Sequence, residues 1–155
     1  MTNTTGTENT AIGSRSLQSS TTASYNTAVG FKSLYANTSG QINTAVGHRA
    51  LHLNTTAGHN VAIGINALYY NTTGTYNTAC GKNALITNTT GDRNTALGYE
   101  ALKANTTGEG NTGCGMYALY KNTTANNNTA VGYYSLNEST TGASNTAVGY
   151  YAMFD

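Results

Sequence analysis

The sequence predicts an all-β fold, a β-solenoid of nine 17-residue rungs in the form of a parallel β-roll or β-helix. An asparagine recurs every 17 residues and opens a version of the pattern N-T-A-[VIL]-G-x-x-[AS]-L-x-x-N-T-T-G-x-x. No insertion or deletion disturbs this register, so we expect each rung to stack on the next. The repeats begin at residues 9, 26, 43, 60, 77, 94, 111, 128 and 145, after a partial repeat over 1–8, in a single repeat domain of residues 1–155.

Charge is scarce and confined to few columns, a column being the residues that share one position of the repeat. Charged residues make up 8% of the chain, and all of them fall at positions 6, 7, 10, 11, 16 or 17, which we therefore expect to face solvent. The net charge of +1 gives no basic surface for nucleic acid, and no apolar run is long enough for membrane insertion. The first residues also lack the basic and apolar regions of a secretory signal.

The first five positions of each unit, as in residues 26–30, are expected to form a short strand. Positions 2 and 4 share one strand face, and position 4 always carries an apolar side chain or a cysteine. We predict that this face points inward and packs with the leucine at position 9. The predicted core residues are Ile12, Val29, Val46, Ile63, Cys80, Leu97, Cys114, Val131 and Val148, with Leu17, Leu34, Leu51, Leu68, Leu85, Leu102, Leu119 and Leu136.

Position 3 holds a small residue in every rung, never a large or charged one. A solvent-facing column would be expected to vary, so something must cover this position. Two interpretations are open: a crowded interior corner of the same coil, or close approach of a second chain, which we favour. The residues of this candidate interchain contact are Ala11, Ala28, Ala45, Ala62, Ala79, Ala96, Gly113, Ala130 and Ala147.

Two corners are expected in each coil. Glycine at position 5 fits a bend, and the N-T-T-G segment fits a turn in which Asn and Thr side chains bond to nearby backbone. The segment between the corners, as in residues 31–36, is either a second strand or a short helical turn. The asparagines at positions 1 and 12 are expected to stack their amides from rung to rung, as amide ladders do in other parallel stacks.

Two surface arrays carry alternative interpretations. The N-x-[ST] sequences are turn elements or, in a secreted chain, glycosylation sites at Asn3, Asn37, Asn54, Asn71, Asn88, Asn105 and Asn122. The exposed tyrosines become more frequent toward the C-terminus, and they form either contact surfaces for other chains or sugars, or stacking ladders between rungs. They are Tyr69, Tyr70, Tyr117, Tyr120, Tyr133, Tyr134, Tyr150 and Tyr151.

The reactive residue types form no catalytic pattern. Cys80 and Cys114 both occupy position 4 but lie two rungs apart, beyond the ~7 Å Cα separation of a disulfide, so we expect buried free thiols, with an interchain bridge as the alternative. His48, His52 and His59 would form a metal site only if this segment were helical. We therefore predict no metal, no cofactor and no catalytic residue, and the protein is not expected to be an enzyme.

The repeat resembles two kinds of fibre protein. The run A-[VI]-G-x-x-[AS], as in residues 28–33 and 147–152, resembles the head repeats of trimeric autotransporter adhesins. The longer unit with A-L-x-x-N-T-T-G is similar to repeats in phage tail-fibre proteins. The resemblance covers residues 3–155 and implies a trimeric β-roll on an extracellular fibre that contacts surfaces.

We therefore predict a non-enzymatic structural protein that self-assembles by stacking and lateral packing into an extracellular filament or the shaft of a virion or cell-surface fibre. The partner would be the chain itself, as a trimer, a head-to-tail filament or both, because the chain starts at position 10 of the unit and ends in phase at position 11. An adhesive or glycan-binding segment of a trimeric adhesin or tail fibre, with surface glycans as partners, is the alternative. Ice binding by the threonines at positions 13 and 14 is a further alternative.

Overall fold

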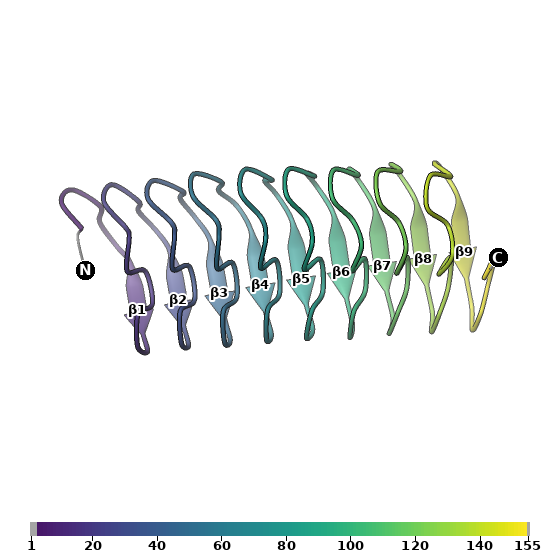
Figure 1. The fold of residues 1–155 in the computed structure, drawn as a ribbon, viewed down its shortest axis with the longest axis horizontal. Coiled ribbons are helices and arrows are strands. Elements are labelled where there is room, and N and C mark those ends of the chain that lie inside the picture. The colour runs from purple at the N-terminus through teal and green to yellow at the C-terminus, as the bar shows by residue number, and fades with distance from the viewer. Residues whose placement is uncertain (1–2, 155) are drawn as a thin grey trace.

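The computed structural model describes residues 3–154 and shows a β-solenoid built on one sheet of nine parallel strands (Figure 1). Strand order in the sheet follows the sequence, so every coil of the chain adds one strand beside the previous one. The predicted fold class is confirmed. The strands are β1 (Thr10–Ile12), β2 (Thr27–Val29), β3 (Thr44–Val46), β4 (Val61–Ile63), β5 (Thr78–Cys80), β6 (Thr95–Leu97), β7 (Thr112–Cys114), β8 (Thr129–Val131) and β9 (Thr146–Val148).

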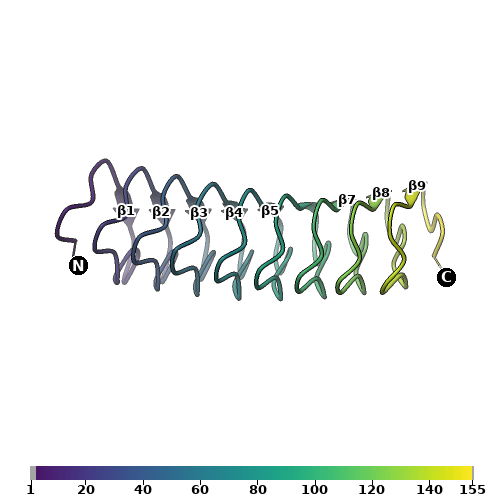
Figure 2. The same cartoon turned by 90° about the horizontal axis from the view of Figure 1, so that it is seen from above.

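The register of the sheet is the register of the repeat. Thr10 pairs with Thr27 and Ala11 with Ala28, and the same 17-residue offset holds through the last pair of strands. Because no rung is shifted along its neighbour, the coils follow one another as a rod with the two ends of the chain far apart (Figures 1 and 2). At ~4.8 Å per rung, nine rungs span roughly 43 Å.

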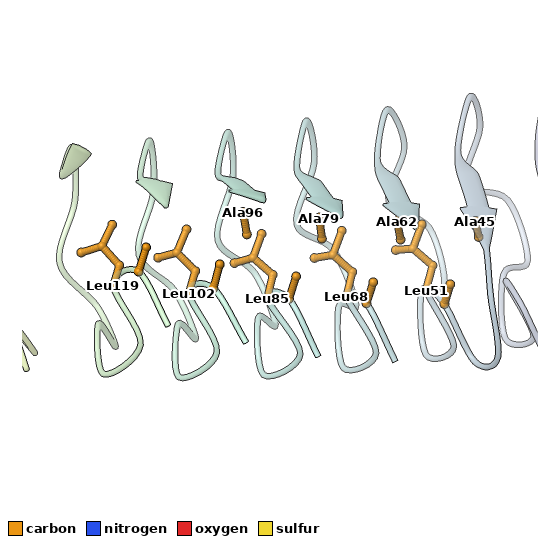
Figure 3. Packing of buried hydrophobic residues seen from close by; sticks show 14 of the residues in the cluster. Ala45, Leu51, Ala62, Leu68, Ala79, Leu85, Ala96, Leu102 and Leu119 are labelled. Atoms are coloured by element: carbon orange, nitrogen blue, oxygen red, sulfur yellow. The ribbon is translucent and has the colours of Figure 1, made fainter. Parts of the chain in front are cut away.

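The core consists of two columns of side chains. The leucines at position 9 are buried, as expected, and Leu34, Leu51 and Leu68 have no exposed surface. The alanines at position 3 lie opposite them, and Ala28 to Ala130 are also fully buried. Figure 3 shows the two columns pointing toward one another across the coil. The core is therefore one leucine and one strand alanine thick, with the position-8 alanines and serines beside them.

The alanine column corrects the predicted strand orientation. Successive strand residues point to opposite sides, so an inward position 3 places positions 2 and 4 on the outside. The space facing the leucines is small: even a Cβ added at Gly113 would lie 3.2 Å from the carbonyl oxygen of Ala118 and 3.3 Å from Cγ of Leu102. Position 3 is therefore covered by the chain's own core and not by a second chain. The prediction that position 3 contacts a second chain is therefore wrong for Ala11, Ala28, Ala45, Ala62, Ala79, Ala96, Gly113, Ala130 and Ala147. The prediction that position 4 lies in the core is wrong for Ile12, Val29, Val46, Ile63, Cys80, Leu97, Cys114, Val131 and Val148.

The segment between the corners is neither a second strand nor a helical turn. Over residues 31–36 it forms consecutive turns, in which Lys32 and Leu34 have φ of 54° and 48°. These positive-φ residues alternate with residues of negative φ, so that their backbone N–H groups point in turn to the preceding and to the following rung. Lys32 N donates to Ser14 O of the preceding rung, and Leu34 N donates to Ala50 O of the following rung, each at 3.0 Å. The rungs are thus hydrogen-bonded outside the strands as well.

Glycine at position 5 is required by close approach of the rungs. Gly64 has φ of +132°, and a Cβ there would lie 2.7 Å from the carbonyl oxygen of Gly81 in the next rung. A side chain at this corner would separate the two rungs and lengthen the strand hydrogen bonds beside it.

The predicted asparagine ladders are present and buried. At position 12, Nδ2 of Asn54 donates to Oδ1 of Asn37, and the same contact continues rung by rung to Asn122. At position 1, the backbone N–H of Asn43 donates to Oδ1 of Asn26, and this contact recurs along the rod to Asn145. These polar columns fill the half of the coil that the leucines leave empty.

Candidate interaction surfaces

The outer sheet face, defined as the side chains at positions 2 and 4 of all nine rungs, is uncharged. Position 2 is threonine in every rung except Val61, and position 4 is Val, Ile, Leu or Cys. The apolar groups of position 4 reach solvent, with 42% of Ile63, 39% of Leu97 and 36% of Val131 exposed. This face repeats in every rung, and an exposed apolar array of this kind marks an interaction site.

The flanking columns widen this apolar surface. Positions 17 and 6, on either side of the strands, also point outward and carry large exposed side chains, among them Ile42, Tyr76, Phe31, Ile65 and Met116. Charged or histidine side chains occur in these flanking columns only in some rungs. The apolar surface therefore extends beyond the strands themselves.

The two cysteines lie on the outer sheet face. Both are free thiols; Cys80 is exposed and Cys114 is half-buried, so the prediction that they are buried is wrong. They lie on β5 and β7, with β6 between them. A disulfide within the chain is therefore out of reach, whereas a bridge to a cysteine of another copy stays a prediction.

Six of the seven candidate glycosylation sites are inaccessible, so the prediction is wrong for them. Their amides belong to the buried ladder, and each Nδ2 also donates to the carbonyl oxygen three residues later, as Asn88 does to Gly91 at 3.0 Å. A glycan on Nδ2 would have to occupy the core. The six are Asn37, Asn54, Asn71, Asn88, Asn105 and Asn122. Asn3 is exposed, and glycosylation there stays a prediction.

The threonines of the turn do not form a double array of free hydroxyls. At position 13 the hydroxyl donates to the carbonyl oxygen of the next rung, as Thr72 does to Thr89 at 3.0 Å. The neighbouring residue at position 14, such as Thr73, is exposed. The hydroxyls at position 13 are thus engaged between rungs, although some of these side chains, such as Thr38, are exposed.

Aromatic side chains stack along the rod. His52 lies between Tyr35 and Tyr69 with its ring centroid 5.0 Å from each, and Tyr133 stacks on Tyr150 at 5.5 Å. Because the rings face one another along the rod axis, mainly their edges are left toward solvent. This arrangement fits the stacking-ladder interpretation of the tyrosines.

The last rungs hold a cluster of tyrosines that contact one another within and between rungs. Tyr134 stacks on Tyr151 at 5.1 Å, and Tyr133 meets Tyr134 edge-on at 4.5 Å. Removal from water and the neighbouring phenols raise the pKa of Tyr133, Tyr134 and Tyr151, so these hydroxyls stay protonated at neutral pH. The cluster is therefore an uncharged aromatic surface.

Charged side chains pair along the rod in its second half. Ion pairs join Arg93 to Glu109, Lys103 to Glu100, and Lys121 to Glu138. Burial opposes ionisation of Glu100, but hydrogen bonds from Asn83 and Lys103 outweigh it and lower its pKa. In the first half of the rod, by contrast, Arg15, Lys32 and Arg49 form no salt bridge with any carboxylate that the structure describes.

A small cavity adjoins the last of these cations. It measures about 180 Å³ and is lined by Arg49, Asn66, Tyr69, Tyr70 and Ile86. The sequence interpretation missed it, although one signal was present: Arg15, Lys32 and Arg49 stand 17 residues apart, in one column. A larger cavity of about 340 Å³ lies over the first rung, against Ala11 and Leu17.

The three histidines stand on separate aromatic columns and do not converge. His48 stacks on Phe31, His52 on Tyr35 and Tyr69, and His59 on Tyr76. Within residues 3–154 there is no group of three or more His, Cys, Asp or Glu side chains placed to hold a metal ion. The described part of the chain also forms no helix with the length and apolarity that a membrane crossing requires.

Comparison with known proteins gives no match to a family model, to a curated protein sequence or to a solved structure.

Proposed function

We propose that this chain is a non-enzymatic structural subunit that self-assembles into an extracellular filament or fibre shaft through its outer sheet face. The observation that carries the proposal is the array of Thr and Val, Ile, Leu or Cys side chains on nine strands in strict register. The resemblance of the repeat to adhesin heads and to tail fibres supports an extracellular location in this proposal.

Lateral packing suits this face because it buries apolar surface without burying charge. No residue at positions 2 or 4 is ionisable apart from the two cysteine thiols. Burying Ile63, Leu97 and Val131 against another copy would add to a core that is only one leucine and one alanine thick. The same symmetry-related face on two or three copies would meet in register, because every rung repeats the last.

The size of the face indicates that the flanking columns take part. Nine rungs at ~4.8 Å and three strand residues at ~3.3 Å give roughly 430 Å² per copy, about half of what a stable protein interface buries on each side. The exposed side chains at positions 17 and 6, such as Ile42 and Ile65, supply further apolar area. Copies would therefore contact one another over the strands and over those rungs of each flank that carry apolar side chains.

Stacking along the rod axis is the second mode of assembly in this proposal. Each rung presents the same backbone amides, carbonyls and asparagine side chains to its neighbour, as the contact of Asn54 with Asn37 illustrates. A rung of another copy is able to pair with them in the same way, and such a head-to-tail contact produces open filaments.

The test places charge on the outer sheet face. The double variant Ile63→Lys/Leu97→Lys is compared with Thr56→Lys/Thr90→Lys, which adds the same charge at exposed turn positions. Light scattering after gel filtration gives the mass, and cryo-electron microscopy shows the form of the particles. We expect the wild type and the turn variant to exceed the chain mass of 16.1 kDa severalfold and to show rods packed side by side. The face variant should lose this lateral packing and leave single rods or rods stacked end to end in single file.

Two results would contradict the proposal. If the wild type stays at the mass of one chain at every concentration and forms no filaments, the chain is not a self-assembling subunit. If the face variant assembles as the wild type does, the outer sheet face is not the contact surface. Circular dichroism spectra of both variants, compared with the wild type, ensure that loss of folding is not mistaken for loss of assembly.

A further inference from the structure

A second copy can meet the outer sheet face in two symmetric ways. If the two rods run parallel, the edge of the sheet after the strands, at positions 6 and 7, meets the edge before them, at position 17. If they run antiparallel about a two-fold axis along the strand direction, each edge meets the same edge of the other copy, and the order of the rungs is reversed. The side chains along the two edges differ from rung to rung, so they distinguish the two arrangements.

Position 7 carries cations at one end of the rod and tyrosines at the other. Its first three occupants are Arg15, Lys32 and Arg49, and its last three are Tyr117, Tyr134 and Tyr151. These side chains lie beside the flanking column at position 6. Nζ of Lys32 is 5.4 Å from the ring centroid of Phe31, and Tyr134 meets Tyr133 edge-on at 4.5 Å. Position 7 therefore belongs to the same edge of the sheet as position 6.

Reversing the rungs about β5 matches these cations with the tyrosines. The opposed pairs are Arg15 with Tyr151, Lys32 with Tyr134, and Arg49 with Tyr117. A cation is attracted to the face of an aromatic ring, and this chain makes such a contact where Nζ of Lys103 lies 5.1 Å from the centroid of Tyr120. Within residues 3–154, neither Arg15 nor Arg49 has a salt bridge or lies over a ring. A reversed copy supplies rings to both.

The other edge of the sheet is complementary in size under the same reversal. At position 17, Tyr25 and Ile42 precede β2 and β3, and 53% and 49% of their surface is exposed. The same column holds Asn127 before β8 and Gly110 before β7. Each large side chain of one copy thus stands opposite a smaller one of the other. In parallel rods, by contrast, Tyr25 would meet the large ring of Phe31, and Gly110 would leave the far end of the contact loose.

Two side chains on β5 and just after it lie beside the axis and face their own counterparts. Cys80 is exposed on the outer sheet face and stands opposite Cys80 of the second copy. Lys82 is a cation in the same situation, but its Nζ leans toward Tyr99 of the next rung, 5.8 Å from the ring centroid. The two-fold axis makes Lys82 of the second copy lean the opposite way along the rod, so the like charges diverge.

We propose that two copies of this chain pair antiparallel through their outer sheet faces, about a two-fold axis along β5. The pairing rests on the proposed self-assembly and gives it an orientation. Because each copy has one outer sheet face, lateral packing through this face stops at two rods. A filament built from such pairs has the same structure in both directions.

The test joins single thiols on opposed faces with a bismaleimide that has a two-carbon linker, because facing sheets lie ~10 Å apart. Val29→Cys and Val131→Cys are introduced separately into the cysteine-free chain Cys80→Ser/Cys114→Ser, and each is produced alone or co-expressed with the other. We expect the co-expressed pair to give a product of twice the chain mass of 16.1 kDa. Each alone should give severalfold less, because its two thiols lie six rungs, roughly 29 Å, apart along the rod.

Two further variants locate the axis and measure chance contacts. Cys114→Ser keeps only Cys80, which should be crosslinked to Cys80 of the second copy without any partner variant. Thr56→Cys on the cysteine-free chain carries an exposed thiol on the turn, away from the outer sheet face, and its product sets the background of random collisions. Circular dichroism spectra matching the wild type show that the variants are folded.

The possible results separate this pairing from the self-assembly on which it rests. If Val29→Cys and Val131→Cys each crosslink alone and co-expression adds no product, the rods are parallel, which overturns the antiparallel pair and leaves self-assembly intact. If the wild type assembles but no variant exceeds the background of Thr56→Cys, the outer sheet faces do not oppose one another. If light scattering gives the wild type the mass of one chain, self-assembly itself fails, and the pairing with it.

Discussion

Nδ2 of Asn54 donates a hydrogen bond of 2.9 Å to Oδ1 of Asn37, its counterpart one rung earlier. The same nitrogen donates to the carbonyl oxygen of Ala57 in its own turn, also at 2.9 Å. One amide thus closes a turn and joins two rungs. Because the column is buried, each member depends on the next, and the rod is expected to lose stability over several rungs when one amide is removed.

Replacing Asn88 tests this dependence. Asn88→Ala leaves Oδ1 of Asn71 and one hydrogen of Asn105 without partners, whereas the carbonyl oxygen of Gly91 keeps its hydrogen bond from Nδ2 of Asn77. Each orphaned buried group costs about 1–3 kcal/mol, so we expect a loss of about 2–5 kcal/mol in the free energy of unfolding. Urea unfolding followed by circular dichroism, at one fixed protein concentration, measures it.

Two further variants define the cause of that loss. Asn88→Asp keeps the shape but cannot donate when ionised, so it should be at least as destabilising as Asn88→Ala at pH 7. Thr90→Ala, at an exposed position of the same turn, should stay within about 0.5 kcal/mol of the wild type. A loss for Asn88→Ala no larger than that of Thr90→Ala would show that the ladder contributes little.

Two leucines on opposite sides of the strand give a matched test of the core. Leu85 has no exposed surface, whereas 39% of Leu97 on the outer sheet face is exposed. We expect Leu85→Ala to cost about 2–5 kcal/mol of unfolding free energy and Leu97→Ala less than about 1 kcal/mol, measured by urea unfolding at high dilution. The reverse order would mean that the strand faces are assigned incorrectly.

The same two columns show how far the sequence determines the fold. The 17-residue period, the strand position, the leucine column and the asparagine ladders all follow from spacing and residue type, because a drift-free repeat must stack identical side chains. Which face of the strand points inward does not follow from spacing and residue type. Hydrophobicity favours Val29 over Ala28 for the interior, yet Leu34 fills so much of the coil that only a methyl group fits opposite it.

The candidate sites were harder to predict for a similar reason. Arg49 and Asn66 stand one rung apart in the position-7 column, which also holds Glu100 and Tyr117, so the residue types of this column mark its cations but not the cavity beside them. Asn88 carries a glycosylation sequence that only its burial excludes. Such properties depend on side-chain packing across rungs, which the repeat pattern alone does not contain.

Ile42 adopts an unfavourable backbone conformation that a substitution can relieve. Its φ is 57°, in the left-handed region, where a β-branched side chain crowds the backbone at a cost of about 1–2 kcal/mol. Asparagine tolerates this region, so we expect Ile42→Asn to raise the free energy of unfolding by about 1 kcal/mol and the melting temperature with it. Differential scanning calorimetry measures the change.

Ile65 is the matched control for this prediction. It is 48% exposed, against 49% for Ile42, but its φ is not positive. Ile65→Asn should therefore give no gain. If both substitutions raise the melting temperature equally, the gain would come from removing an exposed apolar side chain and not from the backbone.

His52 is expected to make the rod less stable in mild acid. The ring is buried between Tyr35 and Tyr69, and Nδ1 lies 3.1 Å from the carbonyl oxygen of Lys32. Burial, with the charges of Lys32, Arg49 and His48 added, lowers the pKa of His52 from its ordinary value of 6.5, although the backbone hydrogen bond opposes this. The charged groups facing the ring are thus cationic, and protonation brings no attractive partner.

The sign of the pH dependence follows from this lowered pKa. Below pH 6.5 His52 is protonated in the unfolded chain but still neutral in the folded chain. The free energy of unfolding therefore falls as the pH falls from 6.5 toward the pKa of His52 in the folded chain. We expect a lower melting temperature at pH 5.2 than at pH 7.5 in the wild type and a smaller difference in His52→Gln. Glu100, whose pKa is lowered from 4.5, weakens the fold only below that pH, so the chosen range separates the two groups. The control is His59→Gln, which removes an exposed histidine stacked on Tyr76 and should keep the wild-type difference in melting temperature between the two pH values. If His52→Gln shows the same difference in melting temperature as the wild type, the acid sensitivity does not come from His52.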